Sequence, residues 1–148
     1  MAQGNINQAE QTKVYSTTQI NDSSVISLPT GAAITDVRCR AVKFDANGNV
    51  ILAGAGDKPF GVGIITNDVN VAQGNNVDIQ YKNIGLVYTG GQFAAGANLS
   101  VDANGSFVAA TTGESATAVV AVALQASAGA GAYVRALLTM GNGYVAAE

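Results

Sequence analysis

The chain of 148 residues contains no histidine, no tryptophan and a single cysteine. The lack of histidine removes the most common general base and the most common protein ligand for transition metals. One cysteine cannot form a disulfide within the chain, so nothing indicates an oxidising compartment. We therefore expect no enzyme, no metal, no cofactor and no small-molecule substrate.

Charge is also scarce, because the 7 basic and 10 acidic residues make up only 11% of the chain. An average globular domain has about 25%. The few basic residues are scattered, which argues against a nucleic-acid partner. No apolar run reaches the length of a membrane span, and the first residues lack the pattern of a signal peptide. A weakly charged surface is poorly protected against association, so either an ordinary neutral surface or an assembly subunit would explain the composition.

Short apolar runs are what the sequence does contain, separated by Gly, Asn and Asp about every 8–12 residues, a spacing typical of all-β proteins. The clearest case is 77–82, where Val77, Ile79 and Tyr81 alternate with polar residues. We predict an all-β, mainly antiparallel fold with little helix, built as a compact β-barrel or β-sandwich with an extended N-terminal arm. The expected strands are 25–28, 34–44, 49–53, 60–66, 76–82, 85–88, 98–101, 106–110, 118–124 and 133–140.

One segment, 114–128, supports two interpretations. Its alanine content is compatible with a helix. However, Val120, Val122 and Leu124 alternate with alanine, and glycines bound the stretch. We favour a buried strand and leave the helix as the alternative.

The predicted domains are a flexible N-terminal arm over 1–24 and a single β domain over 25–148. The arm is polar, and its large apolar residues are Ile6, Val14, Tyr15 and Ile20. These four are the candidate contacts with a partner protein, and 14–20 could form a short strand. A frayed terminus would explain the same composition.

An internal repeat with an offset of 57 residues relates 42–50 to 99–107. Further along, the register slips, because Val62-Gly63-Ile64 resembles Val122-Ala123-Leu124 best. The repeat predicts that the β domain has two similar halves, about 41–80 and 98–137.

Asp-Ala-Asn-Gly occurs in both halves, at 45–48 and 102–105. Asn-Gly between apolar runs favours a hairpin with a type I′ turn, in which both central residues have positive φ. A calcium loop is the alternative, since Asp45, Asn47 and Asn49 offer side-chain oxygens. The glycine and glutamate spacing of an EF-hand is absent, so we expect hairpins.

Two further features have structural rather than chemical explanations. The glycines at 54–56 and 61–63 do not complete a phosphate-binding motif, so we expect turn and strand glycines. Cys39 lies between two arginines, which could activate a thiol. In an extended strand, however, it would share a face with Val37 and Ala41, and we expect a small core residue.

A series of short motifs in a distinctive order carries a resemblance to a known family. They are Lys58-Pro59-Phe60-Gly61-Val62-Gly63-Ile64, Gly74-Asn75-Asn76-Val77-Asp78-Ile79, Gly85-Leu86-Val87-Tyr88, Ala95-Gly96-Ala97-Asn98-Leu99, Val101-Asp102-Ala103-Asn104-Gly105, Val120-Ala121-Val122-Ala123-Leu124 and a last strand around Val134. This pattern resembles the capsid decoration, or cement, proteins of tailed bacteriophages over about residues 40–140. The glycine usual before the Ala-Leu piece is replaced by Val120 or Ala121, and 1–30 are unmatched.

The resemblance implies a small β protein that binds the outer surface of an icosahedral capsid, often as a trimer, and stabilises the head. The expected partners are then the major capsid protein and two further copies of the chain. The expected location is the virion exterior, after synthesis in the host cytoplasm. Another assembly subunit, of a fibre, pilus or surface layer, and a small carbohydrate-binding module are the alternatives.

Overall fold

A computed structural model describes residues 23–112 and 117–144 of the chain, with side chains to residue 140. None of these residues lies in a helix, so this part of the chain has no helix that could cross a membrane. The prediction of an all-β chain is confirmed. The strands are β1 (Val25–Pro29), β2 (Ile34–Thr35), β3 (Ala41–Phe44), β4 (Val50–Leu52), β5 (Gly61–Gly63), β6 (Asn70–Val71), β7 (Asn76–Gln80), β8 (Ile84–Tyr88), β9 (Gln92–Phe93), β10 (Asn98–Val101), β11 (Phe107–Ala109), β12 (Ala118–Ala123), β13 (Ser127–Ala128) and β14 (Tyr133–Tyr144).

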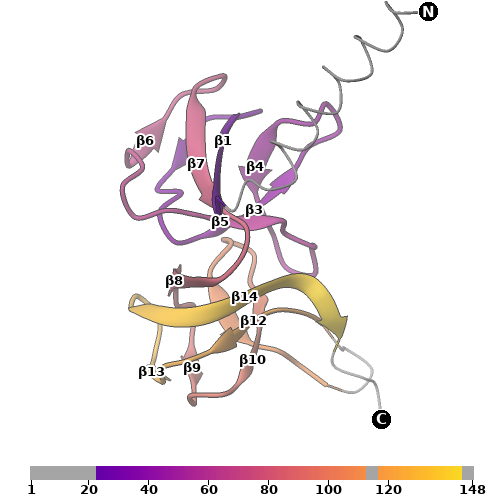
Figure 1. Ribbon diagram of the computed structural model, residues 1–148, viewed down its shortest axis with the longest axis vertical. Coiled ribbons are helices and arrows are strands. Elements are labelled where there is room, and N and C mark those ends of the chain that lie inside the picture. Colours follow the sequence, from indigo (N-terminus) through magenta and orange to yellow (C-terminus); the bar gives the residue numbers. More distant parts are fainter. Residues whose placement is uncertain (1–22, 113–116, 145–148) are drawn as a thin grey trace, which may run out of the picture.

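The strands form two lobes that lie one above the other along the long axis (Figure 1). The first lobe, 23–81, has a five-stranded sheet in the order β1-β7-β5-β3-β4 and a small sheet of β2 and β6. The second lobe, 84–112 and 117–144, has a sheet in the order β11-β10-β12-β14-β8 and a small sheet of β9 and β13. All these strands pair antiparallel. The sheets do not close into a barrel, and of the two predicted architectures the sandwich fits.

Both lobes follow one topology. Read from the β1 and β8 edges, the sheets run β1-β7-β5-β3-β4 and β8-β14-β12-β10-β11. The pairing of β3 with β4 recurs residue for residue, 57 positions later, in β10 and β11. The pairing of β5 with β7 recurs in β12 and β14, but Val62 corresponds to Val122, 60 positions later. The register therefore slips where the sequence repeat slips. The predicted limits of the arm and of the halves stay predictions.

The strand ends are fixed by the same side-chain hydrogen bonds in each lobe. The buried Thr30 hydroxyl donates to the Ala72 carbonyl at 3.0 Å and accepts from the Gly74 amide at 3.1 Å. In the second lobe, the buried Thr89 hydroxyl donates to the Gly129 carbonyl at 2.8 Å and accepts from the Ala132 amide at 2.9 Å. Buried polar groups need such partners, because leaving them unpaired costs free energy.

The two Asp-Ala-Asn-Gly segments form hairpin turns, but the predicted type I′ geometry is wrong. Only the glycine of each Asn-Gly pair has a positive φ, +80° at Gly48 and +72° at Gly105. The aspartate carboxylate sets the turn instead, since Asp45 Oδ1 accepts the Asn47 and Asn49 amides at 2.8 and 2.9 Å. Asp102 accepts two amides in the same way. The turn is therefore a longer loop that ends in a left-handed glycine.

The single strand predicted over 34–44 is wrong, because the chain breaks between β2 and β3. Asp36 and Cys39 have positive φ values of 57° and 59°, which end extended pairing. Cys39 is buried, as predicted, but it does not sit in an extended strand. Cys39 occupies a turn position that Gly96 occupies in the second lobe. The Cys39 amide donates to the Gly63 carbonyl at 2.7 Å, and the Gly96 amide donates to the Ala123 carbonyl at the same distance.

Three short strands, β6, β9 and β13, were not predicted, because two-residue pairings carry too little pattern to detect. In the ambiguous 114–128 segment, the structure has strand β12 followed by β13. The strand interpretation is therefore confirmed for the described part of that segment.

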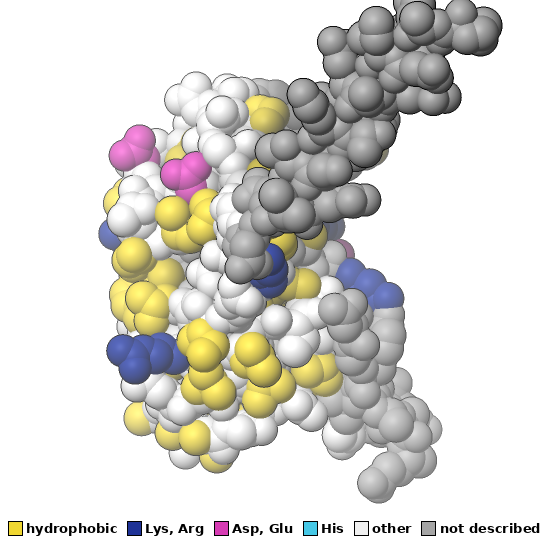
Figure 2. All heavy atoms as spheres, in the orientation of Figure 1, with side chains coloured by type: hydrophobic (Ala, Val, Ile, Leu, Met, Phe, Trp, Pro, Cys, Tyr) yellow, Lys and Arg dark blue, Asp and Glu magenta, His cyan; other side chains and the backbone are white. Residues whose placement is uncertain are grey.

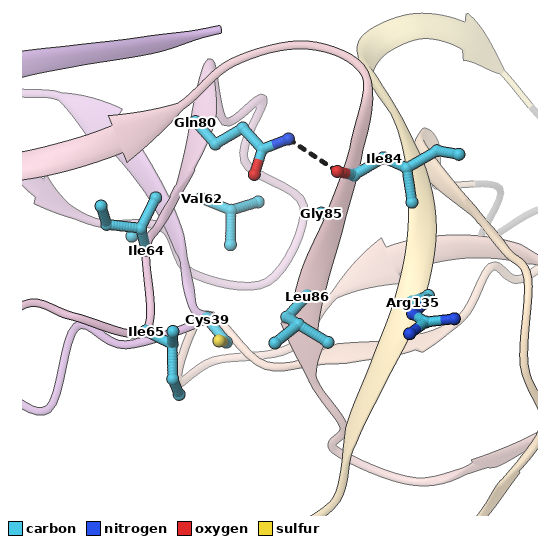
Figure 3. Close-up of a pocket in the computed structure, with 10 residues that line it drawn as sticks. Cys39, Val62, Ile64, Ile65, Gln80, Ile84, Gly85, Leu86 and Arg135 are labelled. Atoms are coloured by element: carbon cyan, nitrogen blue, oxygen red, sulfur yellow. Dashed lines mark hydrogen bonds between the residues drawn. The ribbon is translucent and has the colours of Figure 1, made fainter.

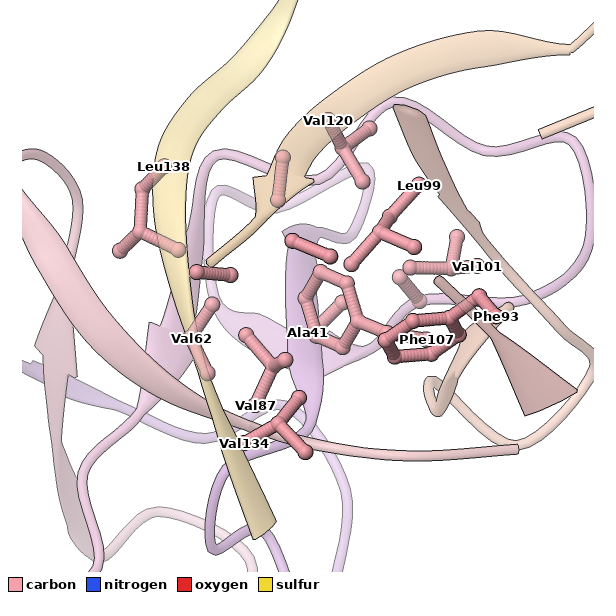
Figure 4. Close-up of a cluster of buried hydrophobic side chains, with 14 residues drawn as sticks. Ala41, Val62, Val87, Phe93, Leu99, Val101, Phe107, Val120, Val134 and Leu138 are labelled. Atoms are coloured by element: carbon pink, nitrogen blue, oxygen red, sulfur yellow. The ribbon is translucent and has the colours of Figure 1, made fainter. Parts of the chain in front are cut away.

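Each lobe has its own apolar core. The first core lies within the first lobe and consists of Ile34, Val37, Val42, Val50, Val71, Val77 and Ile79. The second core belongs mainly to the second lobe, around Phe107, Leu99 and Val120 (Figure 4). It also contains Ala41 and Val62 of the first lobe. The second core therefore extends across the lobe boundary and joins the two lobes.

Candidate docking surfaces

The residues predicted to contact a partner, Ile6, Val14, Tyr15 and Ile20, lie outside the described residues. Their role therefore stays a prediction. On the two described lobes, patches of exposed large apolar side chains indicate candidate protein interfaces.

Two carboxylates among the described residues, Asp36 and Asp57, form local ion pairs. Asp36 accepts two hydrogen bonds from the Arg38 guanidinium, which lowers the pKa of that carboxyl. Asp57 lies 2.7 Å from Lys43 Nζ, and its pKa is lowered too, by that hydrogen bond first and by the Gly54 amide second. In 23–112 and 117–144, no three His, Cys, Asp or Glu side chains gather where they could hold a metal.

The thiol of Cys39 is not positioned for chemistry. Burial raises its pKa to about 11, and this effect exceeds the opposing effect of the Arg38 charge. A thiol with such a pKa is protonated at neutral pH, so it is a poor nucleophile.

The first apolar surface is the outer face of β8 and β14, which we call the β8–β14 face. Its members are Ile84, Leu86, Tyr133, Arg135 and Leu137. Ile84 and Leu137 lie opposite each other in the pairing and are 57% and 42% exposed. Figure 2 shows hydrophobic side chains spread over β14 on this side of the lower lobe. β8 is the edge strand of its sheet, and on its outer side the Tyr88 amide donates to the Cys39 carbonyl of the first lobe at 2.7 Å.

The β8–β14 face continues into a cavity of about 350 Å³ at the lobe boundary. Figure 3 shows Ile65 and Leu86 on either side of Cys39, with Arg135, the charged residue of the lining, beyond Leu86. Gln80 Nε2 donates to the Ile84 carbonyl at 2.9 Å, which fixes the start of β8 against the first lobe. The cavity walls are mostly apolar, so the region suits a protein side chain better than an ion.

The second apolar surface is a groove in the first lobe, which we call the phenylalanine groove. It has a volume of about 350 Å³ and is lined by Ile26, Leu28, Phe44, Phe60 and Tyr81. The rings of Phe44 and Phe60 stack with centroids 4.0 Å apart and planes 5° apart. Its lining contains no charged side chain, so it offers apolar contact area rather than polar recognition.

Sequence reasoning missed both surfaces. For the β8–β14 face a signal existed, because in 133–138 both alternating sets of positions carry apolar residues. A strand buried on one face should alternate apolar with polar residues, so large residues on the second face indicate a further contact. For the phenylalanine groove there was no such signal, because Phe44 and Phe60 belong to different segments of the sequence and come into contact only when the chain folds.

Comparison with known proteins gives a structural match without a sequence match. No protein-family model matches the chain, and no curated protein matches it. Among solved structures, the chain is similar to the N base of head fiber gp8.5 in bacteriophage phi29, with a TM-score of 0.57. The two are 16% identical, and the match covers 79% of this chain and 94% of that one. At such low identity, the likeness shows a shared fold.

Proposed function

We propose that the chain is a non-catalytic structural protein of a bacteriophage virion that binds the outside of the head and stabilises it. Its partners are the major capsid protein and further copies of itself, and it is made in the host cytoplasm. Two supports are independent of each other. The sequence motifs resemble capsid decoration proteins, and the fold is similar to that of a head fiber base.

The observation that carries this proposal is the β8–β14 face. It presents Ile84, Leu86, Tyr133 and Leu137 to solvent, each at least 39% exposed. Complete burial of a fully exposed large apolar side chain contributes about 1.5–3 kcal/mol, and each of these side chains would contribute the share that corresponds to its exposed part. The outer edge of β8 adds little to this, because the Tyr88 amide already donates to the Cys39 carbonyl and the Ile84 carbonyl already accepts from Gln80 Nε2. The exposed face therefore favours attachment by contact area, which is what a head-stabilising protein requires.

Co-sedimentation with empty heads that lack this protein tests the proposal, with the oligomer mass measured by light scattering. The wild-type chain should sediment with the heads, and Leu137→Glu should lose that binding, because the new carboxylate would be buried at the contact. Val69→Glu is the matched control, since Val69 is 43% exposed and belongs to the first lobe rather than to β8 or β14.

A trimer mass that is unchanged in Leu137→Glu would support a head contact at this face. A fall to monomer mass would contradict that assignment, because the face would then join copies of the chain. Failure of the wild-type chain to bind heads would overturn the proposal.

A second candidate function is a segment of a head fibre rather than a decoration protein. The likeness to the head fiber N base favours it, because the match covers nearly all of that chain. A fibre segment should form elongated assemblies, visible by negative-stain microscopy, without stabilising heads against heat. A carbohydrate-binding module is less well supported, since the phenylalanine groove lacks the polar groups that orient sugars.

A further inference from the structure

The phenylalanine groove marks a place where the first lobe lacks a cover that the second lobe has. By the shared strand pairings, Phe44 corresponds to Val101 and Leu28 to Val87. Val101 and Val87 are buried, at 4% and 0% exposure, whereas Phe44 is 48% exposed. The same part of the sheet is thus closed in one lobe and open in the other.

The cover of the second lobe comes from the chain that precedes its edge strand. Ala41, Ala53 and Val62 of the first lobe belong to the same core cluster as Val87 and Val101. These three residues all precede β8, the edge strand of the second sheet. The equivalent edge strand of the first lobe is β1, and the chain that precedes it is 1–24, of which 1–22 lie outside the described residues.

Ser23 and Ser24, the first described residues, lie beside the groove. Tyr81, a groove residue, donates its hydroxyl hydrogen to the Ser23 carbonyl, and its amide donates to the Ser24 carbonyl at 3.0 Å. Ile20 is three residues before Ser23, a reach of roughly 10 Å for extended chain. An apolar side chain at position 20 is therefore within range of the groove.

The chemistry of the segment also fits. Residues 14–20 read Val-Tyr-Ser-Thr-Thr-Gln-Ile and carry no charge. The groove lining is uncharged too, so an apolar side chain can enter without burying an ion. Valine, tyrosine, threonine and isoleucine are good strand formers, and β1 has an unpaired edge among the described residues.

We propose that residues 14–20 of the same chain occupy the phenylalanine groove and complete the first core. A short tether keeps the local concentration of the segment in the millimolar range, which favours its own groove over that of a second copy. This proposal is independent of head binding and goes beyond the proposed function.

A fluorescent reporter tests it, because the chain has no tryptophan of its own. Phe44→Trp places an indole in the groove at an exposed position that tolerates the larger ring. Deleting 1–22 from this variant should shift the emission to the red and remove protection from acrylamide quenching. Tyr133→Trp, on the β8–β14 face, is the control reporter and should not respond to the deletion.

Point variants locate the contact within the segment. In the Phe44→Trp background, Ile20→Glu should reproduce the effect of the deletion, whereas the adjacent Gln19→Glu, which adds the same charge, should not. Methyl NMR shifts of Ile26 and Leu28 in the otherwise unaltered chain report the same event without the reporter. Both should move when 1–22 are removed.

Identical emission, quenching and methyl shifts with and without 1–22 would overturn the proposal. Protection that disappears on dilution would overturn it as well, because the occupant would then be a second copy of the chain. Neither measurement uses heads, so failure here and failure of the proposed function are distinguishable.

Discussion

The two lobes share a strand order, a turn set by an aspartate carboxylate, and a buried threonine hydroxyl that fixes the strand ends, which we call the threonine lock. They differ in how the apolar face of the main sheet is covered. The second lobe buries Phe107 and Leu99 at no measurable exposure and borrows Ala41, Ala53 and Val62 from its neighbour. The first lobe has smaller core residues and an open groove at one end. Each lobe of a repeated fold thus needs residues that cover the apolar face of its sheet. Among the described residues, only the second lobe has that face fully covered.

The largest expected difference between the lobes concerns their cores. Phe107 and Val50 are equivalent by strand pairing, and both are fully buried. Phe107→Ala should lower the free energy of unfolding by about 3–5 kcal/mol, because it leaves a large cavity. Val50→Ala removes fewer atoms and should cost less. Denaturant unfolding measures both, and equal losses would contradict the expectation that the larger side chain of the second core contributes more to stability.

A second test compares two equivalent turn glycines. A Cβ on Gly48 would meet nothing within 4 Å, whereas a Cβ on Gly105 would lie 2.9 Å from the Ala41 carbonyl oxygen. Both positions have positive φ, so alanine is strained at each. Gly105→Ala should cost about 1–3 kcal/mol more than Gly48→Ala, because only it also overpacks the lobe boundary. Thermal unfolding of the pair checks this, and equal melting temperatures would argue against a tight boundary.

The threonine locks should behave alike. Thr30→Val and Thr89→Val each remove a buried hydroxyl that donates to one backbone carbonyl and accepts from one backbone amide. Each should lower the free energy of unfolding by about 1–3 kcal/mol. Chemical denaturation is the measurement, with Thr112→Val, at an exposed position, as control. A loss confined to one lobe would show that the locks are not equivalent.

The smallest effect concerns acid. The pKa of Asp57 is lowered below its ordinary value of 3.8 in the folded chain. Its stabilising effect is therefore present above about pH 3.8 and is lost as the pH falls through the lowered pKa. Asp57→Asn should make the free energy of unfolding less dependent on pH in this acid range. Asp68→Asn, at an exposed carboxyl, is the control. An unchanged acid profile in Asp57→Asn would contradict a stabilising Lys43 pair.

Much of this fold could be predicted from the sequence, because strand alternation and the 57-residue repeat reflect local geometry. The positions of most strands, the hairpins at Asp45 and Asp102 and the burial of Cys39 follow from such patterns, whereas the break between β2 and β3 and the short strands β6, β9 and β13 do not. What could not be predicted depends on contacts between distant residues. Cys39 in a left-handed turn conformation is one case, since a non-glycine residue gives no local sign of positive φ.

The docking surfaces illustrate the same limit. The prediction that contact residues lie in the arm rested on the composition of the arm. Its four residues, Ile6, Val14, Tyr15 and Ile20, lie outside the described residues. The β8–β14 face arises because Ile84 and Leu137 become neighbours only when the strands pair. Sequence periodicity shows which residues share a face of one strand, but not which faces the rest of the chain leaves uncovered.

The hydrogen bonds across the lobe boundary have a mechanical consequence. The Ala41 amide donates to the Gly105 carbonyl at 2.8 Å, and the Tyr88 amide donates to the Cys39 carbonyl at 2.7 Å. Arg40 adds a bond to the Asn104 carbonyl at 3.0 Å. A tensile load entering through β1 and leaving through β14 would stretch these bonds together. Under such a load the two lobes should move together as one rigid body rather than bend relative to each other at the boundary.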